Sequence, residues 1–139
     1  MLLHVIARGK IARTPEAELV SRYQKRIHWP LRLSELPESG GSTAVPLNPC
    51  KTILLDERGK NLSSIELAAL IEKWRDIGIR EMRFIIGPAD GHGDDVIEQA
   101  DLLLAFGKST WPHLLARAML MEQIYRSTAI IAGHPYHRQ

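Results

Sequence analysis

Short apolar segments alternate along the chain with longer segments in which apolar residues recur every three or four positions. The short segments are rich in Leu, Ile and Val, which predicts strands, and the longer ones have the spacing of helices with one apolar face. We expect strands at residues 2–7, 31–36, 52–56, 82–87 and 102–106. We expect helices at residues 14–27, 63–77, 94–100 and 111–131.

Two of these helices carry signals at their ends. Thr14 is a suitable N-cap for the first helix, and Pro15 suits its first turn. Ser63 and Glu66 have the spacing of a capping box, and Gly78 is placed to end the same helix. The boundaries of both helices are therefore predicted from local chemistry as well as from periodicity.

The last helix is apolar around most of its circumference. Pro112 is placed to open it, and Ser109 or Thr110 to cap it. A helix without a polar face is usually covered on two sides. In a chain of this size the second cover is expected to be another copy, which predicts a homodimer.

Strand and helix alternate throughout, which predicts an α/β fold with a mostly parallel sheet. Residues 37–49, rich in Gly, Ser and Pro, are expected to form a loop, and residues 57–61 (ERGKN) a turn. A length of 139 residues is enough for one domain with a real core, so residues 1–139 are expected to form a single domain.

Composition and charge exclude several classes of protein. The formal net charge is only +2, whereas a protein that holds nucleic acid through phosphate contacts alone usually has a denser basic field. One cysteine, Cys50, excludes an internal disulfide and a cysteine-based zinc site, and favours a cytoplasmic protein. The apolar start of the chain is too short for a signal peptide, and no segment approaches the length of a membrane span.

Three loops follow predicted strands and carry candidate chemistry. Residues 106–110 (FGKST) look like the end of a phosphate-binding P-loop, but the first glycine of that motif would fall at position 102, which is leucine. Residues 87–93 (GPADGHG) lack the glycine spacing of a dinucleotide site. Residues 54–60 (LLDERGK) form the third loop. All three loops would meet at one edge of a parallel sheet, where ligands of open α/β sheets bind. The sequence predicts one pocket there, or else plain connections.

The chain closes on residues 133–139 (GHPYHRQ), an unusual concentration of reactive side chains for a terminus. His134 and His137 have a spacing that can bind a metal, but no third ligand lies near them in the sequence, so we expect no metal. Pro135 and Tyr136 favour a packed segment over a disordered basic tail.

Four segments, in this order, resemble the ribosomal RNA large subunit methyltransferase H family of the SPOUT superfamily. They are LLDERGKNLSSIELA, FIIGPADG, STWPHLLARAMLMEQIYR and the terminal HPYHR. The likeness covers nearly the whole chain, and its most specific part is the tail joined to the helix that carries PH…E..YR.

The resemblance implies a SPOUT methyltransferase domain with a C-terminal trefoil knot, S-adenosyl-L-methionine as methyl donor, and a homodimer. It implies methylation of N3 of a pseudouridine in 23S rRNA, with the assembled ribosome as substrate. By motif match, the residues that would line the cofactor pocket are Leu55, Gly87, Gly107, Lys108, Ser109, Thr110, Trp111 and Pro112.

The resemblance also gives the tail a role, because a C-terminal tail can reach the cofactor site of the other copy in a SPOUT dimer. His137 is then the candidate base for the N3 proton. Arg138 would stabilise the developing anion or hold phosphate, and Tyr136 would stack on a base or hydrogen-bond to it. His134 and Arg126 are candidate substrate-binding residues.

The chain departs from the family pattern at two places. Ile86 stands where family members commonly have glycine, which is expected to narrow the pocket floor. Residues 37–50 are short where many relatives have a lysine-rich helix, so RNA contacts made by that helix are absent. Two other functions stay open: a SPOUT enzyme that methylates tRNA, and a dimer that binds ribosomes without catalysis.

Overall fold

The sheet comprises five strands in the order β2-β1-β4-β3-β5, and all neighbouring pairs are parallel. The fold comes from a computed structural model that describes residues 1–88 and 92–138. The strands are β1 (Leu2–Arg8), β2 (Leu31–Leu36), β3 (Cys50–Lys60), β4 (Glu81–Ile86) and β5 (Leu102–Leu104). The helices are α1 (Pro15–Arg26), α2 (Ser64–Asp76), α3 (Asp94–Gln99) and α4 (His113–Ile131). The predicted α/β class and parallel sheet are confirmed.

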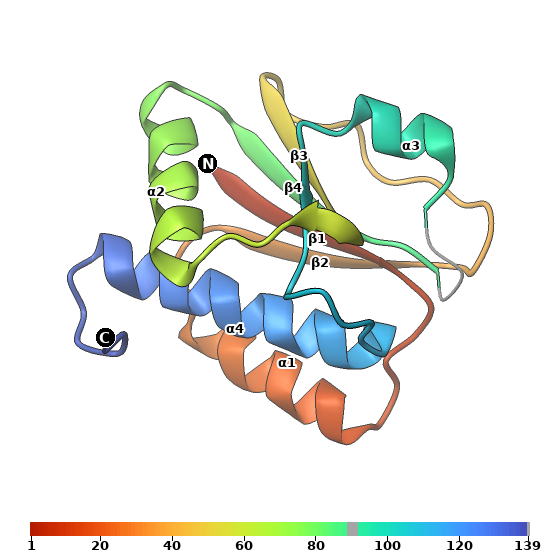
Figure 1. The fold of residues 1–139 in the computed structure, drawn as a ribbon, viewed down its shortest axis with the longest axis horizontal. Helices are drawn as coiled ribbons and strands as arrows, with labels where there is room; N and C mark the ends of the chain where they lie inside the picture. Colours follow the sequence, from red (N-terminus) through yellow and green to blue (C-terminus); the bar gives the residue numbers. More distant parts are fainter. Residues whose placement is uncertain (89–91, 139) are drawn as a thin grey trace.

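One hydrophobic core lies between one face of the sheet and the helices α1, α2 and α4. Alternate strand residues such as Val5, Ile53 and Phe84 point into it, because successive side chains of a strand face opposite sides. α4 contributes Leu120, Met121 and Ile124. Figure 1 shows α4 with α1 below it and the lower end of α2 above it, and both helices pack against α4.

A polar cluster occupies the opposite face of the sheet. His4, Glu81 and Arg83 come from the neighbouring strands β1 and β4 and are buried. His4 Nδ1 lies 3.2 Å from Glu81 Oε2, and Arg83 binds the same carboxylate. Arg83 also donates to Thr43 Oγ1 (3.1 Å), while the backbone N–H of Leu47 donates to Glu81 Oε1 (3.2 Å). The predicted loop at residues 37–49 is thus held against this face by buried charges.

The predicted helix caps are confirmed for α1 and α2 but not for α4. Thr14 and Ser63 cap α1 and α2 through side-chain hydrogen bonds, and the Ser63–Glu66 capping box is complete. The predicted cap of α4 is wrong, because Pro112 is the N-cap residue and no side chain caps the helix. Thr110 instead donates its hydroxyl hydrogen to Glu57.

The predicted turn at residues 57–61 is wrong over residues 57–60, because β3 continues through Lys60. After pairing with β4 up to Leu55, the strand shifts register and pairs Lys60 with Leu104 of β5. Gly59 crosses so close to β5 that a Cβ atom there would lie 2.5 Å from the carbonyl carbon of Leu103. β5 is correspondingly shorter than predicted and ends at Leu104.

Candidate active site

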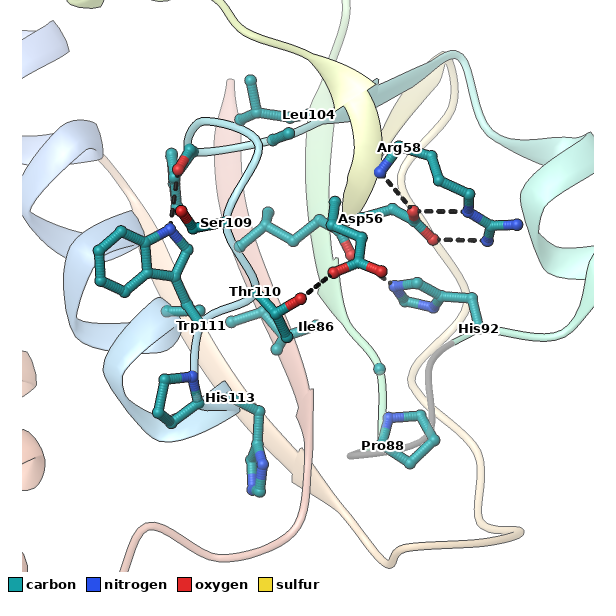
Figure 2. Close-up of a pocket in the computed structure, with 17 residues that line it drawn as sticks. Asp56, Arg58, Ile86, Pro88, His92, Leu104, Ser109, Thr110, Trp111 and His113 are labelled. Carbon is teal, nitrogen blue, oxygen red and sulfur yellow. Dashed lines mark hydrogen bonds and ion pairs between the residues drawn. The ribbon is translucent and has the colours of Figure 1, made fainter.

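The carboxyl ends of β3 and β4 and the segment that leads into α4 surround one cavity of about 830 Å³. Leu55 lines it from β3, Gly87 from the end of β4, and residues 109–112 from the segment before α4. Figure 2 shows Ile86, Ser109 and Trp111 among the side chains around it. The sequence prediction that three strand-end loops meet in one pocket is confirmed. The volume lies in the range of pockets that enclose small molecules.

Part of the wall of this cavity is apolar. Leu104, Phe106, Trp111 and Ala116 line one part, and Ile86 lies in the lining at the end of β4. The indole N–H of Trp111 donates to the Phe106 carbonyl oxygen at 2.8 Å, which fixes the ring against the loop that follows β5. A ligand here would meet apolar side chains on this part of the wall and the charged residues Asp56, Glu57 and Arg58 on another part.

Two carboxylates at the rim are engaged within the chain. Arg58 binds both oxygens of Asp56, with Nε at 2.9 Å and Nη2 at 2.8 Å, and this bonding lowers the pKa of Asp56 to about 2. Glu57 accepts the hydroxyl hydrogen of Thr110, shown as a dashed line in Figure 2. Both bonds tie the end of β3 in place, and the second also tethers the segment before α4.

His92 lines the same cavity and was not predicted from the sequence. Its Nε2 lies 2.9 Å from the Leu55 carbonyl oxygen and donates to it. A Cβ atom on Gly87 would lie 2.8 Å from the His92 ring, so glycine is required for this packing. The signal was present in GPADGHG, where a histidine stands between two glycines, but only the fold shows that its side chain reaches the Leu55 carbonyl of β3. Residues 89–91 of this motif lie outside the described residues.

Gly107 and Lys108 lie apart from the other predicted cofactor residues. Gly107 has a φ of +85°, a conformation that favours glycine, and it lines a second groove of about 550 Å³. That groove runs between α1, α4 and the start of α2, and its apolar lining includes Leu19, Leu115 and Met119. Lys108 is exposed and is absent from the lining residues of both the cavity and the groove.

The tail packs back onto the C-terminal part of α4. The Tyr136 hydroxyl donates to Glu122 Oε1 at 3.1 Å, its ring lies 4.6 Å from the Tyr125 ring, and the Arg126 guanidinium lies 4.7 Å from its centre. Burial and the Glu122 carboxylate raise the pKa of Tyr136 to about 12. The prediction of a packed tail is confirmed for Tyr136.

The other candidate residues at this end of the molecule make fewer contacts or are exposed. Arg126 pairs with Glu122 at 2.6 Å and donates to His137 Nδ1 at 3.1 Å. His134 is exposed, and its Nδ1 accepts the backbone N–H of Tyr136 at 3.1 Å, while Arg138 is exposed. Glu122 organises this cluster and was not among the predicted site residues, although it belongs to the PH…E..YR pattern.

The cavity and the tail lie at opposite ends of α4. His113, at the start of the helix, lines the cavity, and the tail begins after its last residue, Ile131. A helix of 19 residues spans roughly 28 Å at 1.5 Å per residue. In Figure 1 the segment that follows α4 is accordingly far from the carboxyl end of β4. Within one chain, the candidate base and the cavity are therefore too far apart to act together.

Comparison with known proteins decides the family. The family described as "Predicted SPOUT methyltransferase" matches residues 1–137. A protein of Erythrobacter litoralis named ribosomal RNA large subunit methyltransferase H is 67% identical over 138 residues, which is 99% of each chain. Proteins of the same name from Novosphingobium aromaticivorans and Zymomonas mobilis are 60% and 50% identical, and each covers 100% of this chain and 99% of its own length.

The chain belongs to the ribosomal RNA large subunit methyltransferase H family of SPOUT methyltransferases. The resemblance read from the four motifs is thereby confirmed, and the aligned length includes both the cavity and the tail.

Two further findings concern the described part of this family member. Among residues 1–88 and 92–138, no group of three or more His, Cys, Asp or Glu side chains is placed to hold a metal ion. None of the helices described is both long and apolar enough to cross a membrane.

Proposed function

We propose that this protein transfers a methyl group from S-adenosyl-L-methionine to N3 of a pseudouridine in 23S rRNA, within the assembled ribosome in the cytoplasm. The observation that carries the proposal is the single cavity formed by the three predicted strand-end loops in a member of a methyltransferase family. The names of its close relatives support a ribosomal RNA substrate.

The cavity fits the proposed donor. Apolar walls around Leu55, Phe106 and Trp111 suit an adenosine, and Gly87 belongs to the same lining. Leu55, Gly87 and residues 109–112 would hold the donor, and Gly107 and Lys108 would shape the loop beside it. When bound, S-adenosyl-L-methionine supplies an activated methyl group on a sulfonium sulfur, so precise placement would provide much of the rate.

The tail would supply the residues that act on the nucleoside. The bound donor would give its methyl group to N3 and leave as a neutral thioether that keeps the electron pair, while the N3 proton would pass to a base of the protein. We assign the base to His137. Its Nδ1 accepts a hydrogen bond from Arg126, so that lone pair becomes available only when Arg126 turns away. Arg138 would stabilise the anion, Tyr136 would stack on or bond to a base, and Arg126 and His134 would contact the RNA.

The distance between tail and cavity requires a second copy. We propose a homodimer in which each tail serves the cavity of the other protomer. The groove lined by Leu19, Leu115 and Met119 is a suitable docking surface, because it is apolar and lies beside the loop 104–107 that borders the cavity. The basis for the dimer is this groove rather than an uncovered α4, since α1 and α2 already pack on that helix.

We further propose that residues 1–139 act as one methyltransferase domain and that the chain forms the trefoil knot of SPOUT enzymes. One hydrophobic core and a family match over residues 1–137 support the single domain. The crossing of Gly59 over the backbone of Leu103, with the register shift around it, is the kind of close chain crossing that a knot requires.

Methyl transfer from labelled donor to ribosomes that lack the modification tests the proposal. Three variants separate the parts of the site. Deletion of residues 136–139 should abolish transfer but keep donor binding by calorimetry in the presence of a chelator. His137→Ala should slow transfer roughly 10²–10⁴-fold. Arg138→Lys should not restore the full rate, because an ammonium does not reproduce a planar guanidinium.

Mixing experiments test the exchange of tails between protomers. A Gly87→Val protein that no longer binds donor and a protein without residues 136–139 should each be inactive alone. After co-refolding, mixed dimers should regain part of the activity, because one intact cavity then faces one intact tail. No recovery would contradict the shared site. Transfer to tRNA, or equal rates on protein-free 23S rRNA and on ribosomes, would contradict the assigned substrate.

A further inference from the structure

The small net charge of the chain hides a strong separation of charge along it. Residues 8–32 contain seven lysines and arginines and two glutamates, a net charge of +5. The remaining residues contain eleven lysines and arginines and fourteen aspartates and glutamates, a net charge of −3. A net charge of +2 therefore describes a protein with a basic part and an acidic part.

The basic part is concentrated on the outer face of α1. Leu19, Val20 and Tyr23 of this helix face the protein, and the exposed side carries Arg22, Lys25 and Arg26. The spacing of these cations, at i, i+3 and i+4, places them next to one another on one surface of the helix. Arg13 and Lys10, both exposed, extend this surface beyond the N-terminal end of the helix. We call Arg22, Lys25 and Arg26 the α1 basic face.

The cations of this face differ from five arginines elsewhere in the protein. Arg58, Arg75, Arg83, Arg117 and Arg126 each form an ion pair with a carboxylate. Within residues 1–88 and 92–138, no ion pair involves a cation of the α1 basic face. Among the described residues no direct ion pair therefore neutralises these three cations, and the one carboxylate on the same side of α1 is Glu18, one turn before Arg22.

Four of the acidic residues lie together on the other side of the molecule. α3 and its flanks carry Asp94, Asp95, Glu98 and Asp101, and Figure 1 shows α3 at the upper right and α1 along the lower edge. A polyanion would be attracted to the side of α1 and repelled from the side of α3. The charge distribution would therefore orient a bound polyanion.

The α1 basic face also adjoins the candidate catalytic tail. The Tyr23 ring lies 6.0 Å from the Tyr125 ring, which in turn lies 4.6 Å from the Tyr136 ring. The C-terminal half of α1, which carries the basic face, is therefore at the same end of the molecule as the tail. A strand of RNA that placed a nucleoside at the tail would pass near this face.

We propose that the α1 basic face binds the phosphate backbone of the RNA substrate and orients it toward the tail. This inference rests on the proposed function. RNA is favoured over an anionic membrane because the exposed positions beside the cations, Ser21 and Gln24, are polar, and neither offers a large apolar side chain that could enter a lipid surface. Lys and Arg side chains bind the phosphates of RNA through their positive charge, and a cluster of exposed cations is sufficient for such contacts.

The test compares two variants that remove the same charge. The first is Arg22→Gln/Lys25→Gln/Arg26→Gln, which keeps good helix formers on α1. The matched control is Lys60→Gln/Lys73→Gln/Arg80→Gln, three exposed cations outside the face. Binding to unmodified ribosomes and to protein-free 23S rRNA is measured over a series of salt concentrations, and donor binding by calorimetry monitors the fold.

The α1 variant should lower the magnitude of the slope of log affinity against log salt by about 2 to 3, and the control by less than about 1. Donor binding should be unchanged in both. Equal slopes for the two variants, no RNA binding by the unaltered protein, or binding to anionic lipid vesicles without binding to RNA would each overturn the inference. If the unaltered protein binds RNA through α1 but transfers no methyl group, the proposed function is wrong and the surface stands.

Discussion

His4 is buried in an arrangement that fixes its protonation. Its Nδ1–H donates to Glu81 and its Nε2 accepts the Ser34 hydroxyl hydrogen at 2.7 Å, so both ring nitrogens are satisfied in the neutral form. Burial lowers the pKa of His4 despite the nearby carboxylate. The pKa of Glu81 is also lowered, because bonds from Arg83, Leu47 and His4 outweigh the effect of burial. Both groups therefore resist protonation in the folded state.

These two shifts predict loss of stability in acid. As the pH falls below the ordinary His value of 6.5, the unfolded chain takes up a proton that folded His4 refuses, so the free energy of unfolding falls. A second loss begins below 4.5, where Glu81 of the unfolded chain is protonated first. Urea unfolding over a pH series should show both steps. His4→Gln should remove the upper one, and parallel curves for both proteins between pH 7 and about 5 would contradict this account.

Arg83 contributes more to the free energy of unfolding than its neighbour Arg80. It compensates the buried Glu81 carboxylate and bonds to Thr43 and Ala44 of the loop above the sheet. Arg83→Met should lower the free energy of unfolding by about 3–5 kcal/mol, because it leaves a buried charge without its partner. The exposed Arg80→Met should change it by less than about 0.5 kcal/mol. Equal effects in urea unfolding would show that the cluster is not a source of stability.

At the scale of elements, sequence reasoning succeeded where the determinants are local. The capping hydrogen bonds of Thr14 and Ser63 join residues three apart, and the end of α2 at Gly78 has a φ of +92°. Such features can be predicted from a few neighbouring residues. The same reasoning placed a turn at residues 57–60, where Gly59 and the polar residues around it are typical of turns.

The turn was wrong because tertiary contact overrides local preference there. Glycine is needed at position 59 for close approach to the backbone of β5, not for a reversal of the chain. The cap of α4 was wrong for a related reason, since Glu57, far away in sequence, takes the Thr110 hydroxyl. His92 and Glu122 were missed because their contacts, to Leu55 and to Tyr136, depend on how the chain folds back.

The crossing at Gly59 gives a prediction for β3 as an element. Gly59→Ala should lower the free energy of unfolding by about 1–3 kcal/mol or more, because the Cβ atom forces the two backbones apart. Donor binding should weaken as well, since Leu55 and Phe106 border the cavity on either side of the crossing. Gly78→Ala serves as the control: with open space around it, only the strain of φ +92° remains. Calorimetric unfolding and donor titration of both variants check this, and a smaller loss for Gly59→Ala than for Gly78→Ala would contradict it.

At the scale of the whole molecule, the proposed dimer makes a direct prediction. Light scattering at micromolar concentration should give twice the 15.7 kDa of one chain. Met119→Glu places a charge in the groove between α1 and α4 and should shift the protein to monomers with unchanged helix content. Ala69→Glu, on the exposed side of α2, should leave the mass unchanged. A mass near that of one chain for the unaltered protein would exclude the shared site.

The order of strands in the sheet bears on how the chain folds as it is synthesised. β1 is flanked by β2 and β4, and Leu2 of β1 pairs with Glu81 of β4. The centre of the sheet therefore forms only after β4 has been synthesised, about 80 residues after β1. β3 gains its outer neighbour only when β5 emerges, and the shared core gains α4 after that. Contacts between distant segments slow folding. A nascent chain that stops before α4 would leave part of the apolar face of its strands exposed, so the synthesis of α4 is the step that covers this face and lowers the risk of aggregation.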